Sequence, residues 1–244
     1  MITTTSHGDV ALVEIDRQHR RNALDTEHCQ ALGAAATASV ATGARAVVLT
    51  GAGSAFCSGA DLDGVHSDTF LTALYDALRV VAELGVPVLA AVNGPAIGAG
   101  TQLALAADLR VAAPTARFGL PTAQLGLAVD PWTLRRLALI VGGSVARRIV
   151  LGGEQVTGEQ APALVDRAGD LDVAMAWAAH LATLAPLTLA YSKRVLNEVL
   201  EPELALGAHA AEHEAAFRGC FASDDFAEGR AARAQQRTPV FRGR

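Results

Sequence analysis

The order of strand-like and helix-like segments predicts an α/β fold built around a parallel sheet. In the first half of the chain, short apolar runs alternate with segments of helical periodicity, which is typical of βα units. The second half of the chain consists almost entirely of helical patterns. With 244 residues and a hydrophobic content of 51%, the chain is expected to form a well-packed globular protein rather than a disordered one.

The strands and helices of the first half follow from local patterns. Four short apolar runs predict strands at 10–15, 46–50, 87–92 and 109–112. Three helical patterns lie at 26–39, 69–84 and 98–107. Asp25 is the right residue type to cap the first of these helices.

After Pro131 the pattern becomes helical, and no linker or internal repeat interrupts it. The helices expected there lie at 131–142, 144–151, 157–164, 172–184, 187–200 and 203–219.

Composition and charge exclude several classes of function. A net charge of −5 gives no general attraction to nucleic acid or to an anionic membrane surface. The three cysteines, Cys29, Cys57 and Cys220, have no paired or metal-like spacing, so a disulfide framework is not expected. No apolar run approaches the roughly 20 residues of a membrane span, and the first residues do not form a signal peptide. We therefore expect a cytoplasmic protein with no membrane span and no nucleic-acid partner.

Two glycine-rich segments, 55–62 and 91–100, carry the clearest functional signal. Each follows a short apolar run and places small residues where the backbone must turn sharply. Small residues let a ligand approach main-chain N–H groups that larger side chains would shield. If the two segments meet, two backbone donors can hold one carbonyl oxygen, which is the arrangement of an oxyanion hole in acyl-group chemistry.

Several motifs occur in order along the chain. They are Arg21-Asn22-Ala23-Leu24, Phe56-Cys57-Ser58-Gly59-Ala60-Asp61-Leu62, Asn93-Gly94-Pro95-Ala96-Ile97-Gly98-Ala99-Gly100, Asp108, Phe118-Gly119-Leu120-Pro121 and Leu125-Gly126-Leu127. In these motifs the chain resembles the crotonase superfamily, the enoyl-CoA hydratase/isomerase group, over essentially its whole length. The resemblance implies a crotonase-like spiral of ββα units over 1–190. It also implies a C-terminal helical trimerisation region over 191–244, and hence a homotrimer or a hexamer. The sequence identifies no protein partner.

The resemblance implies a coenzyme A thioester as ligand and no separate cofactor or metal. The N–H groups of Ala60 and Ala99 would polarise the thioester carbonyl. The residues implied to contact coenzyme A are Arg20, Arg21, Ala23, Ser58, Asp61, Leu62 and Phe217. Arginine suits phosphate geometry, although the basic turn at 17–21 can equally be a solvated surface turn. A lysine that many members use for the same contact is replaced here by Gln236.

The two glutamates that hydratases of this family use are absent by this comparison. Gln102 stands at the first position and Thr122 at the second. An amide does not titrate, and a threonine hydroxyl needs a base of its own. Loss of one general acid or base typically costs about 10²–10⁴ in rate, so an ordinary two-glutamate hydratase mechanism is not expected.

Asp130 is the remaining candidate carboxylate. Some relatives that isomerise dienoyl-CoA carry an aspartate at this position, and a dehalogenating relative uses it as nucleophile. The alternative is structural, since Asp130 followed by Pro131 has the pattern of a helix N-cap with proline at the first helical position. A capping carboxylate is stabilised as the anion, which would make it a poorer base.

Three hypotheses for function follow. The favoured one is a binder of fatty acyl-CoA thioesters, in lipid metabolism, with little or no hydratase activity. The second is an enoyl- or dienoyl-CoA isomerase, or another enzyme of enolate chemistry, that uses Asp130. The third is a weak 2-enoyl-CoA hydratase in which Gln102 positions water.

Other readings have less support. Residues 94–100 match a glycine pattern of nicotinamide-dependent dehydrogenases, but the pattern does not follow the first strand, and Tyr191 and Lys193 have the wrong spacing for their catalytic pair. His209 and His213 are spaced as a metal pair without a third ligand. Cys57 could act as a nucleophile only with a histidine partner, for which His66 is nearest in sequence. Three side chains are expected in the wall of the acyl tunnel: Trp132, Arg135 and Arg136.

Overall fold

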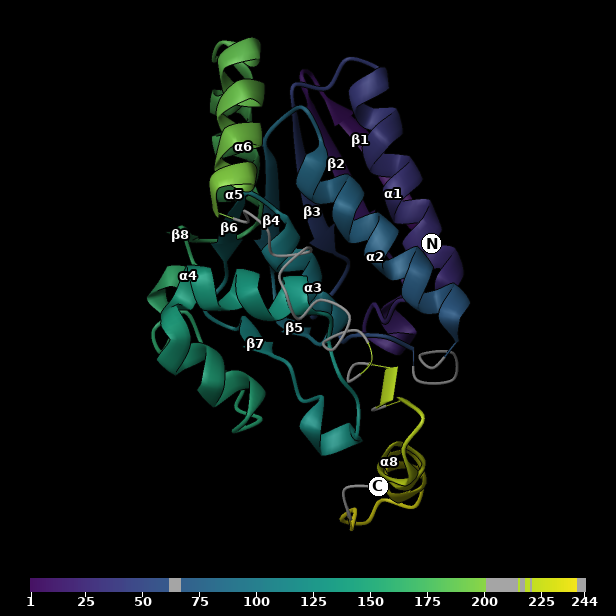
Figure 1. Cartoon of the computed structure of the whole chain (residues 1–244). Helices are drawn as coiled ribbons and strands as arrows, with labels where there is room; N and C mark the ends of the chain where they lie inside the picture. The colour runs from purple at the N-terminus through teal and green to yellow at the C-terminus, as the bar shows by residue number, and fades with distance from the viewer. Residues whose placement is uncertain (62–66, 201–214, 216–217, 220, 241–244) are drawn as a thin grey trace. The chain divides into compact units, whose positions relative to one another are not determined.

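The structure is a computed structural model that describes residues 1–61, 67–200, 215, 218–219 and 221–240. Figure 1 shows the helices and strands of the chain, which divides into two compact units. Unit 1 comprises Met1–Phe118 and Val156–Val199, and unit 2 comprises Gly119–Gln155 and Leu200–Arg244. The predicted division of the chain at residue 190 stays a prediction.

Unit 1 is built on a six-stranded sheet with the order β1-β2-β3-β4-β6-β8. Its strands are β1 (Ile2–His7), β2 (Val10–Ile15), β3 (Ala46–Gly51), β4 (Val88–Val92), β6 (Leu109–Ala112) and β8 (Arg167–Ala168). Only the β1–β2 pair is antiparallel, and β2 to β8 pair in parallel. A separate two-stranded sheet joins β5 (Pro95–Ile97) to β7 (Arg117–Gly119). The predicted α/β fold with a parallel sheet is therefore confirmed.

The helices described in unit 1 are α1 (Thr26–Ala41), α2 (Asp68–Glu83), α3 (Ala99–Ala106), α5 (Leu171–Ala182) and α6 (Pro186–Leu200). Three of these five helices, α1, α2 and α5, begin at a capping side chain. Asp25 accepts a hydrogen bond from the His28 N–H, and Ser67 accepts one from the Phe70 N–H. Such caps satisfy N–H groups that have no partner inside the helix. Helices α1 and α2 pack against each other, and α1 also contacts β1, β2 and β3.

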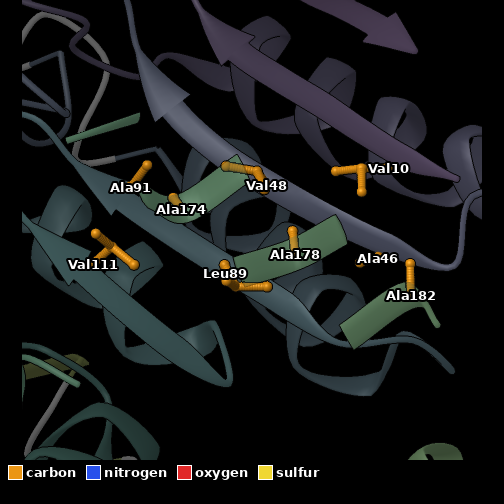
Figure 2. Close-up of a cluster of buried hydrophobic side chains, with 9 residues drawn as sticks. All are labelled: Val10, Ala46, Val48, Leu89, Ala91, Val111, Ala174, Ala178 and Ala182. Carbon is orange, nitrogen blue, oxygen red and sulfur yellow. The ribbon is translucent and has the colours of Figure 1, made fainter. Parts of the chain in front are cut away.

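Helix α5 lies against one face of the sheet through alanines. Ala174, Ala178 and Ala182 are buried (Figure 2). Their partners on the sheet are Val10, Ala46, Val48, Leu89, Ala91 and Val111. The short alanine side chains let the helix approach the strands closely. Every residue of β3 is buried, so its opposite face is covered as well, as expected for parallel strands.

No single helix in the described ranges is long and apolar enough to cross a membrane. Helices α5 and α6 pass that test only as a pair, and they are bent by 111° relative to each other.

The described part of unit 2 includes a long helix, α4 (Pro131–Val150), and a short C-terminal helix, α8 (Asp224–Ala234). Helix α4 is interrupted at Gly142, whose φ of 76° is not helical. Helix α8 begins at the Ser223 cap and lies against the single 3₁₀ turn Ala123–Leu125. At this contact Gly126 and Gly229 admit no Cβ, since it would overlap the carbonyls of Asp225 and Leu125 respectively.

Most of the predicted elements are present within a residue or two, but some predictions were wrong. Strands β1, β5, β7 and β8 and helix α8 were not predicted. The helix expected at 157–164 is absent: Thr157 and Gln160 form a turn by mutual side-chain hydrogen bonds, and only Pro162–Leu164 is helical, as a 3₁₀ turn. Proline cannot continue the preceding turn. The helices expected at 131–142 and 144–151 correspond to the two parts of α4 on either side of the non-helical Gly142, so this prediction is confirmed. Most of the helix expected at 203–219 lies outside the described residues.

The core of unit 1 makes a simple stability prediction. Leu89 is completely buried between the sheet and α5, so Leu89→Ala should lower the free energy of unfolding by about 2–5 kcal/mol. Leu187→Ala removes the same atoms from a side chain that is 85% exposed and should change stability by less than about 0.5 kcal/mol. Urea unfolding followed by circular dichroism measures both. Equal effects in the two variants would contradict the packing described here.

Candidate functional site

The two glycine-rich segments lie side by side in unit 1. The Cys57 N–H donates to the Pro95 carbonyl at 3.1 Å, and the Ile97 N–H donates to the Cys57 carbonyl at 2.9 Å. Cys57 and Ala96 thus form a parallel bridge. The structure therefore fulfils the condition that the two segments meet.

Glycine is required where the segments approach most closely. A Cβ on Gly94 would overlap the Ser54 carbonyl, and a Cβ on Gly100 would overlap the Cys57 carbonyl. In both cases the obstacle is backbone, which cannot move aside as a side chain can. The glycines therefore serve backbone-to-backbone packing, with no need for a nucleotide-binding turn.

The N–H of Ala60 is directed away from its neighbouring strand. Leu24 donates to the Gly59 carbonyl at 2.8 Å and accepts from the Asp61 N–H at 2.6 Å. In such a parallel bridge the middle residue, Ala60, turns its own N–H to the opposite side. Segment 95–99 adjoins the residue before Ala60, since a Cβ on Gly59 would lie 3.0 Å from the Ile97 carbonyl oxygen. Within the described part of the chain, the Ala60 N–H makes no backbone hydrogen bond.

The N–H of Ala99 is a helix N-terminal donor. Ala99 is the first residue of α3, whose first N–H groups have no partner within the helix. Gly98 makes the turn into the helix with a φ of 55°, a conformation that favours glycine. An ideal Cβ on Gly59 would lie 3.9 Å from the Ala99 nitrogen, so the two loops adjoin at this point. Two backbone donors beside one another can together bind one acceptor oxygen.

Two asparagines, the buried Asn22 and the half-buried Asn93, hold the loop that precedes Ala60. Asn22 donates from Nδ2 to the carbonyls of Ala52 and Ala55, at 2.9 and 2.8 Å. Asn93 donates from Nδ2 to the carbonyls of Gly51 and Gly53, at 2.7 and 2.8 Å. Both asparagines belong to the motifs that the sequence shows, but no local pattern predicted that they bind these carbonyls. Their side-chain contacts depend on segments 30 to 42 residues away.

Five of the residues implied to contact coenzyme A lie in or beside this loop within the described part of the chain: Arg20, Arg21, Ala23, Ser58 and Asp61. Arg20 and Arg21 are exposed, and Ala23 is buried. Ser58 is held by two hydrogen bonds, from its Oγ to the Arg20 carbonyl at 3.1 Å and from its N–H to the Arg21 carbonyl at 3.0 Å. The Asp61 carboxylate pairs with Arg17 at 2.8 Å. Asp61 thus has a structural partner that the sequence did not reveal.

Gln102 is buried on α3, with 3% of its surface exposed. It lies three residues beyond Ala99, on the first turn of the same helix. Thr122 and Asp130 belong to unit 2, where Thr122 precedes the 3₁₀ turn Ala123–Leu125. The roles assigned to these three side chains stay predictions.

Asp130 caps α4, as one of the two readings of the sequence proposed. It accepts hydrogen bonds from the N–H of Thr133 at 3.0 Å and from the Thr133 hydroxyl at 2.6 Å. Burial nevertheless raises the pKa of the Asp130 carboxyl above its ordinary value, and the Thr133 hydrogen bonds only partly offset this. The capping hydrogen bonds lower the pKa of Asp130 as the sequence predicted, but burial raises it by more.

Cys57 does not have the environment of a nucleophile. It is completely buried, its Sγ lies 3.7 Å from the Gly59 carbonyl, and burial raises the pKa of the thiol to about 12. A reactive cysteine needs a lowered pKa and access to solvent.

Some predicted residues lie outside the described residues. They are Leu62, His66, His209, His213 and Phe217. Among the described residues, no group of three His, Cys, Asp or Glu side chains is placed to hold a metal ion. Two of the three expected tunnel-wall side chains contact each other, since the Arg136 guanidinium lies 5.9 Å from the Trp132 ring centroid. The Nη1 atom of the third, Arg135, is buried and has no hydrogen-bond partner among the described residues.

Comparison with known proteins identifies the family. The family model described as enoyl-CoA hydratase/isomerase matches residues 5–244. The chain belongs to the enoyl-CoA hydratase/isomerase family. It is 43% identical over 249 residues to a probable enoyl-CoA hydratase, echA6, of Mycobacterium bovis, covering 100% of both chains. It is 36% identical over 246 residues to 2,3-dehydroadipyl-CoA hydratase of Escherichia coli K12, covering 96% of both.

Solved structures of the family share this fold. An enoyl-CoA hydratase/isomerase from Pseudoalteromonas atlantica T6c has a TM-score of 0.86 at 31% identity and covers 99% of both chains. A methylmalonyl-CoA decarboxylase has a TM-score of 0.91 at 21% identity, covering 100% of this chain and 98% of the other. The second likeness concerns the fold alone. The predicted crotonase fold and family are thereby confirmed.

The raised pKa of Asp130 predicts a pH dependence of stability. A raised pKa means that the folded protein binds the proton more tightly than the unfolded chain, so this contribution is present at low pH and is lost as the pH rises through the folded pKa. Asn caps helices as well as Asp, so Asp130→Asn should remove only the titration. The free energy of unfolding of the wild type, minus that of Asp130→Asn, should fall between pH 4 and pH 7 in urea titrations.

A matched control is Asp170→Asn, at the exposed cap of α5. It reports the effect of exchanging the capping residue alone. A flat or rising difference for Asp130→Asn would contradict the assignment of burial as the dominant effect.

Proposed function

We propose that this protein binds fatty acyl-CoA thioesters and holds the thioester carbonyl oxygen between the N–H groups of Ala60 and Ala99. The observation that carries the proposal is the pairing of the two loops, which leaves both N–H groups without a backbone acceptor in the described part of the chain. The position of Ala99 at the start of α3 adds the positive end of the helix dipole. Both effects stabilise negative charge on one oxygen.

Coenzyme A recognition forms part of the same proposal. The exposed guanidinium groups of Arg20 and Arg21 suit phosphate oxygens. Ala23, Ser58, Asp61 and Leu62, with Phe217, would contact the adenine and pantetheine parts of the ligand. Support comes from relatives named as enzymes of CoA thioesters, including the E. coli hydratase of 2,3-dehydroadipyl-CoA. We assign no further cofactor and no metal.

Little or no two-glutamate hydratase activity is the second part of the proposal. Gln102 is buried beside Ala99 on the first turn of α3, at the position where family hydratases carry a glutamate, and its amide cannot take a proton from water near neutral pH. Thr122 likewise has no titratable group near neutral pH. The names of the relatives favour hydration instead, so the experiment below separates binding from turnover.

A second candidate is enolate chemistry that uses Asp130, such as an enoyl- or dienoyl-CoA isomerisation. The raised pKa of Asp130 favours it, because a base works best when its pKa lies near the operating pH. The test is deuterium exchange at Cα or Cγ of bound acyl-CoA, lost in Asp130→Asn. We also propose that the protein is a cytoplasmic homotrimer or hexamer, and this part of the proposal rests on the family resemblance alone.

The proposed lack of hydratase activity is tested with 2-enoyl-CoAs of short, medium and long chain, monitored by mass for the gain of one water. We expect binding in isothermal titration with hydration at least about 10²-fold slower than typical enzyme turnover. Gln102→Glu combined with Thr122→Glu should raise the hydration rate. Rapid hydration by the wild type would contradict the proposal and support a hydratase with another acid–base pair.

The oxyanion donors are tested with Ala99→Pro. Proline is tolerated at the first position of a helix, and it lacks the N–H, so the substitution deletes one donor. The control Ala99→Ser keeps the N–H. In ¹³C-edited infrared spectra of bound octanoyl-CoA, the thioester carbonyl should shift less from its free position in Ala99→Pro than in Ala99→Ser. Equal shifts in two folded variants would contradict the role of Ala99.

A further inference from the structure

Arg17 contacts both Asp61, which follows Ala60 in the chain, and residues 23–25, which pair with Ala60. Its Nη1 lies 2.8 Å from Oδ2 of Asp61 and donates to the Ala23 carbonyl at 3.1 Å. Its Nη2 lies 3.4 Å from Oδ2 of Asp25, the cap of α1. One guanidinium therefore joins the 23–25 segment, which pairs with Ala60, to Asp61, the residue that follows Ala60.

Backbone hydrogen bonds also hold the segment that carries Ala60 on this side. Leu24 holds it through the two backbone hydrogen bonds to Gly59 and Asp61, and Ser58 bonds to the turn before it. Gly59 has a φ of 113°, so the backbone between Ser58 and Ala60 is in a conformation that most residues avoid. A donor on such a backbone keeps its direction only where the flanking residues are held.

The Arg17 network is itself well anchored. The Arg17 N–H donates to Oδ1 of Asn22 at 2.9 Å, and Asn22 is the completely buried side chain that holds the Ala52 and Ala55 carbonyls. The side chains of Arg17 and Asp61 are only 15% and 12% exposed. An ion pair withdrawn from water to this degree is less screened by salt than a surface pair.

We propose that Arg17 is a positioning residue that fixes the direction of the Ala60 N–H through Asp61 and the Ala23 carbonyl. This inference rests on the proposed function, since it assigns Arg17 to the first of the two oxyanion donors. Arginine is required because its planar fork reaches three acceptors at once, which a lysine ammonium on a flexible stem does not do. Small displacements of a catalytic or binding group have large consequences, about 10²-fold for 1 Å in enzymes.

The test compares Arg17→Met with Arg79→Met. Arg79 forms an ion pair of the same length with Asp76, at 2.8 Å, but the side chains are 61% and 56% exposed on α2. Each variant is titrated with octanoyl-CoA and with coenzyme A, which lacks the thioester carbonyl. The ¹³C-edited infrared spectrum of bound octanoyl-CoA then reports how strongly the carbonyl is polarised.

We expect Arg17→Met to lose at least half of the wild-type carbonyl shift and about tenfold in affinity for octanoyl-CoA, the value of one net hydrogen bond. Its affinity for coenzyme A should fall by a smaller factor, because coenzyme A can lose only the contacts of Asp61 and Ala23 and not the carbonyl contact. Arg79→Met should match the wild type in all three measurements. A structural role alone would instead lower both affinities together and leave the carbonyl shift of the bound fraction unchanged, and this result would overturn the inference.

Two further results keep the inference and the proposed function separate. If the wild type shows no carbonyl shift at all, the proposed oxyanion hole fails, and the role of Arg17 fails with it. If the wild type shows the shift and Arg17→Met shows the same shift, only the inference fails. Should Arg17→Met not fold, Asp61→Asn removes the charge at the other end of the pair, and it must likewise reduce the carbonyl shift while circular dichroism shows a native fold.

Discussion

The contact on which the site depends is the backbone pairing of Cys57 with the 95–97 segment. Through this bridge, two loops that follow different strands of the sheet become one small structure. The pairing needs Gly94 and Gly100, because backbone carbonyls occupy the space that a Cβ would take. A larger residue at either position would separate the loops, and with them the N–H groups of Ala60 and Ala99.

The polar side chains around these loops act on backbone groups. Asn22 and Asn93 together bind four carbonyls between Gly51 and Ala55, and Arg17 binds the carbonyl of Ala23. Buried polar groups of this kind specify one backbone arrangement because each lost partner is costly. The chemistry proposed for the protein uses main-chain donors, so the conformation of the backbone is what such side chains must preserve.

Local patterns predicted the sheet and its helices well because these elements have strong signals of their own. The β-branched run of β3 and the capping residue Asp25 are readable without tertiary structure. Strand β1 lacked such a signal, since its threonine-rich residues are mostly exposed at the sheet edge. Strands β5 and β7 have three residues each and exist only through their pairing. The helix expected at 157–164 does not form. Pro162 follows the turn made by Thr157 and Gln160, and it has no N–H to continue the hydrogen bonding of that turn.

The sequence by itself determined the fold class, the family and the two segments that carry the proposed oxyanion donors, since these depend on motifs and on apolar periodicity. Only the tertiary structure decided that the segments meet, that Asp61 pairs with Arg17, and that burial outweighs capping at Asp130. The reason is physical: the direction of an N–H group, the partner of a charge and the desolvation of a carboxyl all depend on residues distant in the chain. No local pattern encodes them.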